Sequence, residues 1–180
     1  MENAIKGRSL FVDAVSFKDM RLYMLTVIFV AGNIVLPWIC HVVPNGGRIF
    51  LPIFFFTLIA SYKFGIRAGL ATAILSPLAN FILTGMPAAA MLPSVLIKSI
   101  LLAAAAAYCA AHFKKVSLLL LAAAVVFYQA AGAVFDFALF HNAAAVFLSV
   151  KTALPGLLIQ IAAGYLILSG VRGYGDKTDR

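Results

Sequence analysis

Apolar segments of membrane-spanning length are the feature that most constrains how this chain can fold. A helix that crosses a bilayer needs about 20 predominantly apolar residues. Hydrophobic residues make up 64% of the chain and charged residues only 11%, whereas soluble domains contain about half and about a quarter. We therefore predict an all-α integral membrane protein, a bundle of six transmembrane helices in one domain (1–180), with spans at roughly 22–40, 49–64, 68–86, 91–112, 117–140 and 147–171.

The boundary between the second and third predicted spans is short. Only the stretch from Lys63 to Arg67 separates them. One continuous segment over 49–86 would be too long for a single crossing, and it would carry both charges into the bilayer. We therefore expect the chain to cross the membrane twice in this region.

The N-terminal region (1–21) differs from a cleavable signal peptide. Asp13 and Asp19 interrupt its apolar stretch, and no small-residue cleavage pattern follows. Within this region, 9–20 has apolar residues at helical spacing, which indicates either a short interfacial helix or a frayed lead-in to the first span. We expect this region and the tail (172–180) to lie in the cytoplasm.

Basic residues indicate the orientation of the predicted bundle, because lysine and arginine accumulate in cytoplasmic loops. An even number of spans then places both termini inside, in a multi-pass protein of the prokaryotic cytoplasmic (inner) membrane. This topology accounts for the net charge of +8, so we expect no nucleic-acid partner. The basic residues on the predicted cytoplasmic side are Lys6, Arg8, Lys18, Arg21, Lys63, Arg67, Lys114, Lys115, Arg172, Lys177 and Arg180.

Apart from Lys63 at the end of the second span, three charged side chains fall inside predicted spans, all in the outer half. At 1.5 Å per residue, Lys98 lies roughly 10 Å and Asp136 roughly 6 Å below the outer surface, and Lys151 lies at a similar depth. A charge inside the bilayer is costly and is usually paired or functional. Asp136 could pair with Lys98 or Lys151 to hold the bundle, while the spare lysine snorkels to the headgroups. We favour a solvated cup that opens to the outside.

Further polar residues surround this predicted cup. The first outer loop, HVVPNGGRIF, lies over it, and two glutamines nearer mid-membrane could form its floor. Basic groups outnumber acidic ones, so we expect a ligand with a carboxylate or a phosphate. The predicted substrate-binding residues are Lys98, Asp136, Lys151, Arg48, Asn45, His41, Asn80, Asn33, Gln129 and Gln160.

The sequence indicates neither an enzyme nor a metal site. His41 has no second ligand at helical or loop spacing, and Asp136 is the only carboxylate within a predicted span, whereas an aspartyl membrane protease needs two. No glycine-rich nucleotide loop is present. We expect no catalysis, no metal and no covalently bound cofactor, and we expect any uphill transport to depend on a separate source of energy.

This layout resembles the substrate-binding S components of energy-coupling factor (ECF) vitamin transporters. The resemblance covers nearly the whole chain and rests on six short spans, cytoplasmic termini, an outer polar cup and no energy module. The stretch GRIFLPIFFFTLIASYKFGIRAGLATAILSPLANFILTGMP looks like the second and third spans of such proteins. It has a Pro- and Phe-rich helix and a short basic turn, followed by Gly69, Ser76-Pro77, Asn80 and Gly85-Met86-Pro87.

The resemblance implies high-affinity capture of a small vitamin or vitamin-like metabolite from the outer side. It also implies a transmembrane T component and two cytoplasmic ATPase subunits as partners in an ABC importer. The first span lacks the Ala-x-x-x-Ala pattern with which the family often docks its T component, so we consider Ala60, Gly65 and Gly69 for that face. Two alternatives stay open: a self-sufficient small transporter or channel, and a membrane scaffold without a ligand.

Overall fold

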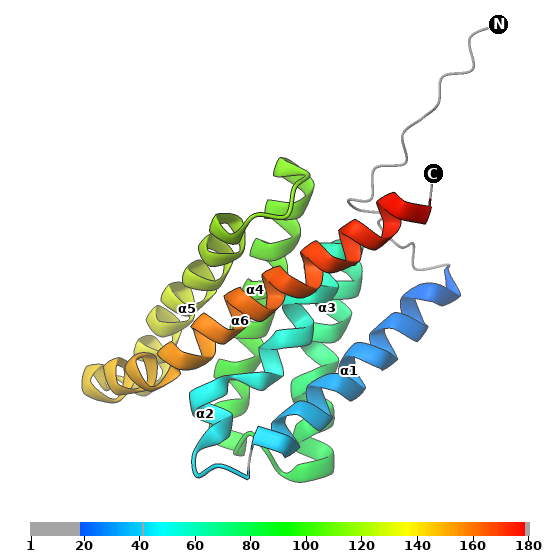
Figure 1. The fold of residues 1–180 in the computed structure, drawn as a ribbon. Helices are drawn as coiled ribbons and strands as arrows, with labels where there is room; N and C mark the ends of the chain where they lie inside the picture. The colour runs from blue at the N-terminus through cyan, green and yellow to red at the C-terminus, as the bar shows by residue number, and fades with distance from the viewer. Residues whose placement is uncertain (1–18, 41, 179–180) are drawn as a thin grey trace, which may run out of the picture.

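A computed structural model of the chain describes residues 19–40 and 42–178, with side chains described up to 170 (Figure 1). The described residues form helices joined by short loops and include no strand, which confirms the all-α prediction. In chain order the elements are α1 (Met20–Cys40), α2 (Gly46–Phe50), the 3-10 helix η1 (Pro52–Phe54), α3 (Phe55–Thr84), the 3-10 helix η2 (Ala89–Met91), α4 (Leu92–Phe113), α5 (Leu118–Phe140) and α6 (Ala143–Thr178).

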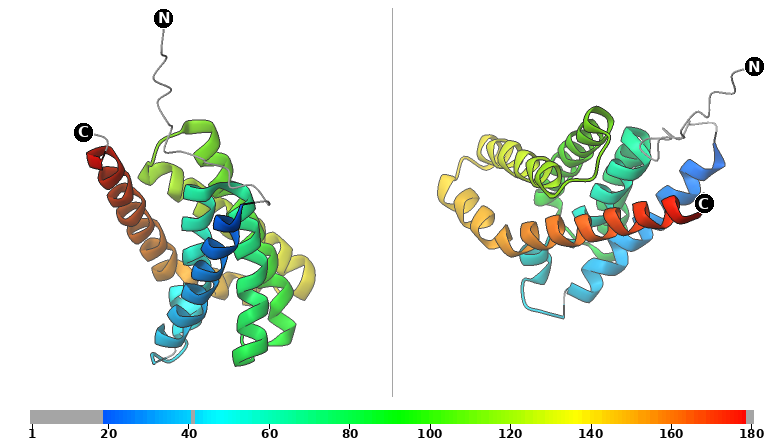
Figure 2. Two further views of the ribbon diagram at one scale, coloured as in Figure 1. Left: turned by 90° about the vertical axis from the view of Figure 1, so that its right-hand side faces the viewer. Right: turned by 45° about the horizontal axis from the view of Figure 1, so that its top comes forward.

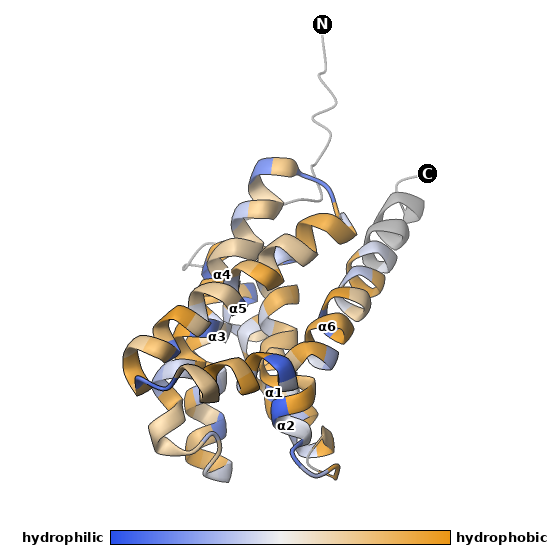
Figure 3. Cartoon of the chain, turned by 90° about the vertical axis from the view of Figure 1, so that its left-hand side faces the viewer, coloured by the Kyte–Doolittle hydropathy of each residue, from blue (hydrophilic) through white to orange (hydrophobic). Residues whose placement is uncertain are grey.

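The surface of the described bundle is apolar. Ile82, Leu119 and Val134 are between 71% and 77% exposed, and hydrophobic colour covers most of the helical ribbon in Figure 3. Such a surface suits lipid rather than water. Five helical stretches are long and apolar enough to cross a membrane, as expected of a multi-pass membrane protein: Met20–Cys40, Pro52–Thr84, Ala89–Phe113, Leu118–Phe140 and Ala143–Gly170.

Helix α3 folds back on itself at Gly65. This residue has a φ of 82°, which glycine adopts without the steric cost of a side chain, and it divides α3 into a first arm (55–64) and a second arm (66–84). The arms pack tightly, because a Cβ atom built on Gly69 would lie 3.0 Å from the Cα of Ser61. The short basic turn of the sequence is therefore a helical hairpin.

Hydrogen bonds from α1 show that α3 reverses its direction at Gly65. The Asn33 Nδ2 donates to Thr57 Oγ1 at 3.2 Å and to Ser76 Oγ at 2.9 Å. In one straight helix those two hydroxyls would be roughly 28 Å apart at 1.5 Å per residue. The two arms of α3 therefore lie side by side at the level of Asn33.

The predicted second span is interrupted near its start. Leu51 adopts a left-handed conformation with a φ of 48°, which separates α2 from η1. Glycine on α6 lets this irregular segment approach closely, because a Cβ atom built on Gly156 would lie 2.4 Å from the Ile49 carbonyl oxygen. One face of the broken segment is therefore covered by α6.

The two ends of the bundle differ in which loops they hold (Figures 1 and 2). The start of α1, the turn within α3, the α4–α5 loop and the end of α6 lie at one end of the bundle, which we call the basic end. The Tyr62 hydroxyl donates to the Lys115 carbonyl at 2.7 Å and joins the turn to that loop. The loops after α1, α3 and α5 lie at the opposite end, which we call the α2 end.

Some details of the fold differ from the sequence prediction. Helix α6 begins at Ala143 rather than at 147, because the Asn142 side chain accepts a hydrogen bond from the Ala145 N–H at 2.9 Å and caps the first turn. The proposed docking residues Ala60, Gly65 and Gly69 are all buried within the bundle, so they do not form an exposed docking face. The predicted lead-in helix falls almost entirely outside the described residues.

Candidate ligand site

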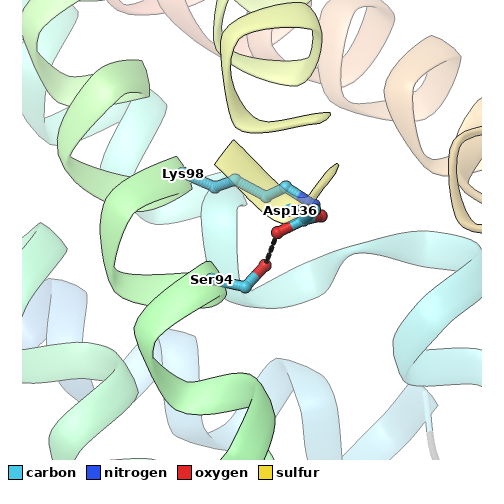
Figure 4. A network of polar contacts seen from close by, with 3 residues as sticks. All are labelled: Ser94, Lys98 and Asp136. Carbon is cyan, nitrogen blue, oxygen red and sulfur yellow. Dashed lines mark hydrogen bonds and ion pairs between the residues drawn. The ribbon is translucent and has the colours of Figure 1, made fainter. Parts of the chain in front are cut away.

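The predicted residues Lys98 and Asp136 meet in a buried cluster between α4 and α5 (Figure 4). The Lys98 ammonium donates to Asp136 Oδ2 at 2.5 Å, and the Ser94 hydroxyl donates to Asp136 Oδ1. Lys98 is 8% exposed and Asp136 is 4% exposed. Ser94 and Lys98 are four residues apart on α4 and so share one helix face. Both carboxylate oxygens of Asp136 therefore have a donor.

Gly132 allows Lys98 to reach Asp136. A Cβ atom built on Gly132 would lie 2.4 Å from Lys98 Cγ and 2.7 Å from Lys98 Cε, so the lysine stem occupies the space that a larger side chain would fill. Gly132 and Asp136 are one helical turn apart on α5. Neither Gly132 nor Ser94 was among the residues predicted from the sequence. Their positions were a readable pattern, because Gly132 precedes Asp136 by four residues and Ser94 precedes Lys98 by four residues.

This cluster has two chemical capacities. Removing one member of a buried ion pair strands the other charge and costs about 3–5 kcal/mol, whereas replacing both members by apolar residues is often neutral or stabilising. The pair thus joins α4 to α5 without being needed for stability. It also has spare donor capacity, because an ammonium carries three N–H donors and Lys98 makes one hydrogen bond here, to Asp136.

Two other predicted basic residues lie near the α2 end but outside this cluster. Lys151 is exposed on the first part of α6, and Arg48 is exposed on α2, as is Asn45 in the loop before it. In the structure Asp136 therefore pairs with Lys98 and not with Lys151. His41 lies outside the described residues.

Asn33 and Asn80 belong to a separate network between α1 and α3. Asn33 Oδ1 accepts from the Phe56 N–H at 3.2 Å, in addition to the two bonds that its amide donates. The Asn80 amide donates to the Asn33 carbonyl at 2.9 Å and to the Ser76 carbonyl at 3.0 Å. These bonds tie α1 to both arms of α3, so these two predicted site residues lie in an interhelical packing network.

The two predicted floor residues, Gln129 and Gln160, are both buried. Gln160 on α6 accepts a hydrogen bond from the Tyr128 hydroxyl on α5 at 3.1 Å. Tyr128 in turn packs against Phe54 of η1, with ring centroids 5.3 Å apart. The sequence analysis had not singled out Tyr128, because a lone tyrosine in an apolar span carries no distinctive pattern.

A shallow hollow of about 240 Å³ lies between α1 and the end of α3. Its lining includes Pro37 and Trp38 from α1 and Asn80 and Thr84 from α3. This hollow is separate from the Lys98–Asp136 cluster, which joins α4 to α5. Among the described residues, no group of three or more histidine, cysteine, aspartate or glutamate side chains is arranged to hold a metal ion.

Comparisons with protein-family models, with curated proteins and with solved structures give no match to this chain. We therefore infer the function from the residues and their geometry.

Proposed function

We propose that this protein captures a small anionic vitamin or vitamin-like metabolite at the α2 end and passes it inward as the S component of an ECF-type ABC importer. The observation that carries the proposal is the buried Lys98–Asp136 pair, about 9 Å along α4 from its start at Leu92. Arg48 and Lys151 are exposed near the same end. The excess of basic groups favours a ligand with a carboxylate or phosphate.

The proposed topology has six crossings, with both termini in the cytoplasm. The fold-back at Gly65 supports this count, because it divides one long apolar stretch into two arms that lie side by side. Lys63 precedes the Gly65 turn, and Lys114 and Lys115 lie in the α4–α5 loop, to which Tyr62 bonds. The positive-inside rule assigns this basic end to the cytoplasm. The α2 end, with the cluster, then faces outward in a prokaryotic inner membrane.

Partners supply the energy in this proposal. The sequence holds no nucleotide-binding motif, and the described bundle is made of apolar helices. A transmembrane T component and two cytoplasmic ATPase subunits would couple ATP hydrolysis to release of the ligand inside. Accumulation of ligand in cells should therefore require those subunits, which separates this proposal from a self-sufficient transporter.

A membrane scaffold is the second candidate, and a specific observation favours it. Both oxygens of Asp136 already have donors within the protein, so the cluster is complete as a helix-to-helix contact. In a scaffold the pair would serve packing alone, and no small molecule would bind.

The deciding experiment is a thermal-shift screen of the detergent-purified full chain against a panel of vitamins. A ligand present at 100 times its dissociation constant stabilises the folded state by about 2.7 kcal/mol. The matched variant is Lys98→Met combined with Asp136→Leu, which leaves no stranded charge. We expect one ligand class to raise the melting temperature of the wild type and to have no effect on the folded double variant.

Two other outcomes would count against the proposal. A panel without any hit would favour the scaffold. A hit that the double variant retains at full affinity would place the ligand away from the Lys98–Asp136 pair, and this pair would then be a packing contact.

A further inference from the structure

The side-chain amide of Gln160 is buried, and its nitrogen donates no hydrogen bond. The residue is 2% exposed, its Oε1 accepts from Tyr128, and its Nε2 has no hydrogen-bond partner. Burying an amide without its hydrogen bonds is costly, and most buried polar atoms in proteins are paired. An unpaired buried amide nitrogen therefore calls for an explanation. A hydrogen bond donated by this nitrogen to a bound molecule would explain it.

The backbone opposite Gln160 is irregular. On α6, Gly156 contacts the Ile49–Phe50 backbone and Gly164 contacts Leu58. Gln160 lies one turn from each glycine and so faces the intervening segment, which holds the break at Leu51 and η1. Interrupted helices at membrane depth are tolerated where the backbone is buried in protein or lines a cavity, and they recur at transporter binding sites.

One stripe of α5 connects this position to the ion pair. Tyr128, Gly132 and Asp136 follow one another at intervals of four residues, and all three are buried. The stem of Lys98 covers Gly132, and a ligand on this stripe would displace that stem. The distance along this stripe from Tyr128 to Asp136 is roughly 12 Å at 1.5 Å per residue.

We propose that the ligand is an extended monocarboxylate with an uncharged carbonyl group at its far end, within the roughly 12 Å that separates Tyr128 from Asp136 along α5. The carboxylate accepts a further hydrogen bond from the Lys98 ammonium, which keeps its bond to Asp136, and the distal carbonyl accepts from Gln160 Nε2 beside the Phe54 and Tyr128 rings. This inference rests on the proposed function and deepens it, because it names the ligand class and the residue that selects it.

The test compares three probes on the detergent-purified full chain by isothermal titration calorimetry. Biotin carries a carboxylate and a carbonyl at its far end, whereas the amide carbonyl of pantothenate lies too near its carboxylate to span this distance, so pantothenate is a control for the spacing. Lipoate shares the pentanoate tail of biotin but has no second carbonyl, so it serves as the matched control. We expect biotin to bind at least about tenfold more tightly than lipoate or pantothenate, the ratio expected for one hydrogen bond in a desolvated site.

The matched variant combines Gln160→Leu with Tyr128→Phe. It removes both partners of the Tyr128–Gln160 hydrogen bond and leaves neither unsatisfied, so the melting temperature should not fall. We expect this variant to lose the preference over lipoate and to bind the preferred probe at least about tenfold more weakly than the wild type.

The contrary outcomes separate the two proposals. Lipoate binding as tightly as biotin, an unchanged affinity in the folded double variant, or a hit confined to vitamins without this pair of groups would overturn the Gln160 inference. In each of those cases the capture function would stand. If no vitamin of the screening panel binds the wild type, both the inference and the proposed function fail.

Discussion

Replacing Asn33 by leucine should test whether hydrogen bonds hold α1 against the α3 hairpin. Asn33 is fully buried, and its side chain makes three hydrogen bonds, to Thr57, to Ser76 and to the Phe56 N–H. Interhelical hydrogen bonds in membrane proteins contribute about 0.6 kcal/mol on average and about 1.7 kcal/mol at most. Three of them give about 2 kcal/mol, with a ceiling of about 5 kcal/mol.

A loss of about 2 kcal/mol would lower the folding equilibrium constant about 30-fold. Reversible unfolding in mixed detergent micelles, followed by circular dichroism, measures the free energy of unfolding directly. The matched control is Thr26→Val on the same helix. The Thr26 hydroxyl is buried but bonds only the Leu22 carbonyl of its own helix, so this variant should lose less than about 0.5 kcal/mol.

The reasoning would be refuted if Asn33→Leu and Thr26→Val proved equally stable within error. In that case the α1–α3 contact would depend on apolar packing, and the amide network would add nothing measurable. A loss close to the ceiling would instead show that the unpaired Phe56 N–H, stranded in a site without water, carries much of the cost.

Three further predictions concern the hairpin and the ion pair. Gly132→Ala should cost about 1–3 kcal/mol, because the new Cβ would overlap the Lys98 stem, while Gly170→Ala, with open space around its Cβ, should be neutral in the same unfolding assay. Gly65→Ala should cost about 1–3 kcal/mol, because its φ of 82° and ψ of −177° lie in a region that is essentially confined to glycine, and a loss no larger than that for Gly170→Ala would contradict the hairpin. Lys98→Met alone should lower the free energy of unfolding by about 3–5 kcal/mol, because it leaves the Asp136 carboxylate without its cation. Adding Asp136→Leu should restore the melting temperature. If the single and double variants were equally stable, the Asp136 charge would not be stranded in the single variant.

The sequence was sufficient for the helical class and for the approximate positions of its apolar segments. Length and hydropathy decide these, because backbone groups in lipid must be satisfied within a helix. The sequence also indicated that charges inside spans would be paired or functional, and the Lys98–Asp136 pair agrees with the paired reading. The cap at Asn142 that starts α6 early was readable but overlooked.

Other features were decided by the tertiary structure. The choice of Lys98 over Lys151 as the partner of Asp136 depends on the groove at Gly132, which forms only when α4 packs on α5. The separation of Asn33 and Asn80 from that pair depends on which helix faces meet, and burial of Ala60, Gly65 and Gly69 depends on the tight fold-back of α3. Hydropathy fixes which segments enter the membrane, but side-chain volume and hydrogen bonding between facing helices decide which residues meet there.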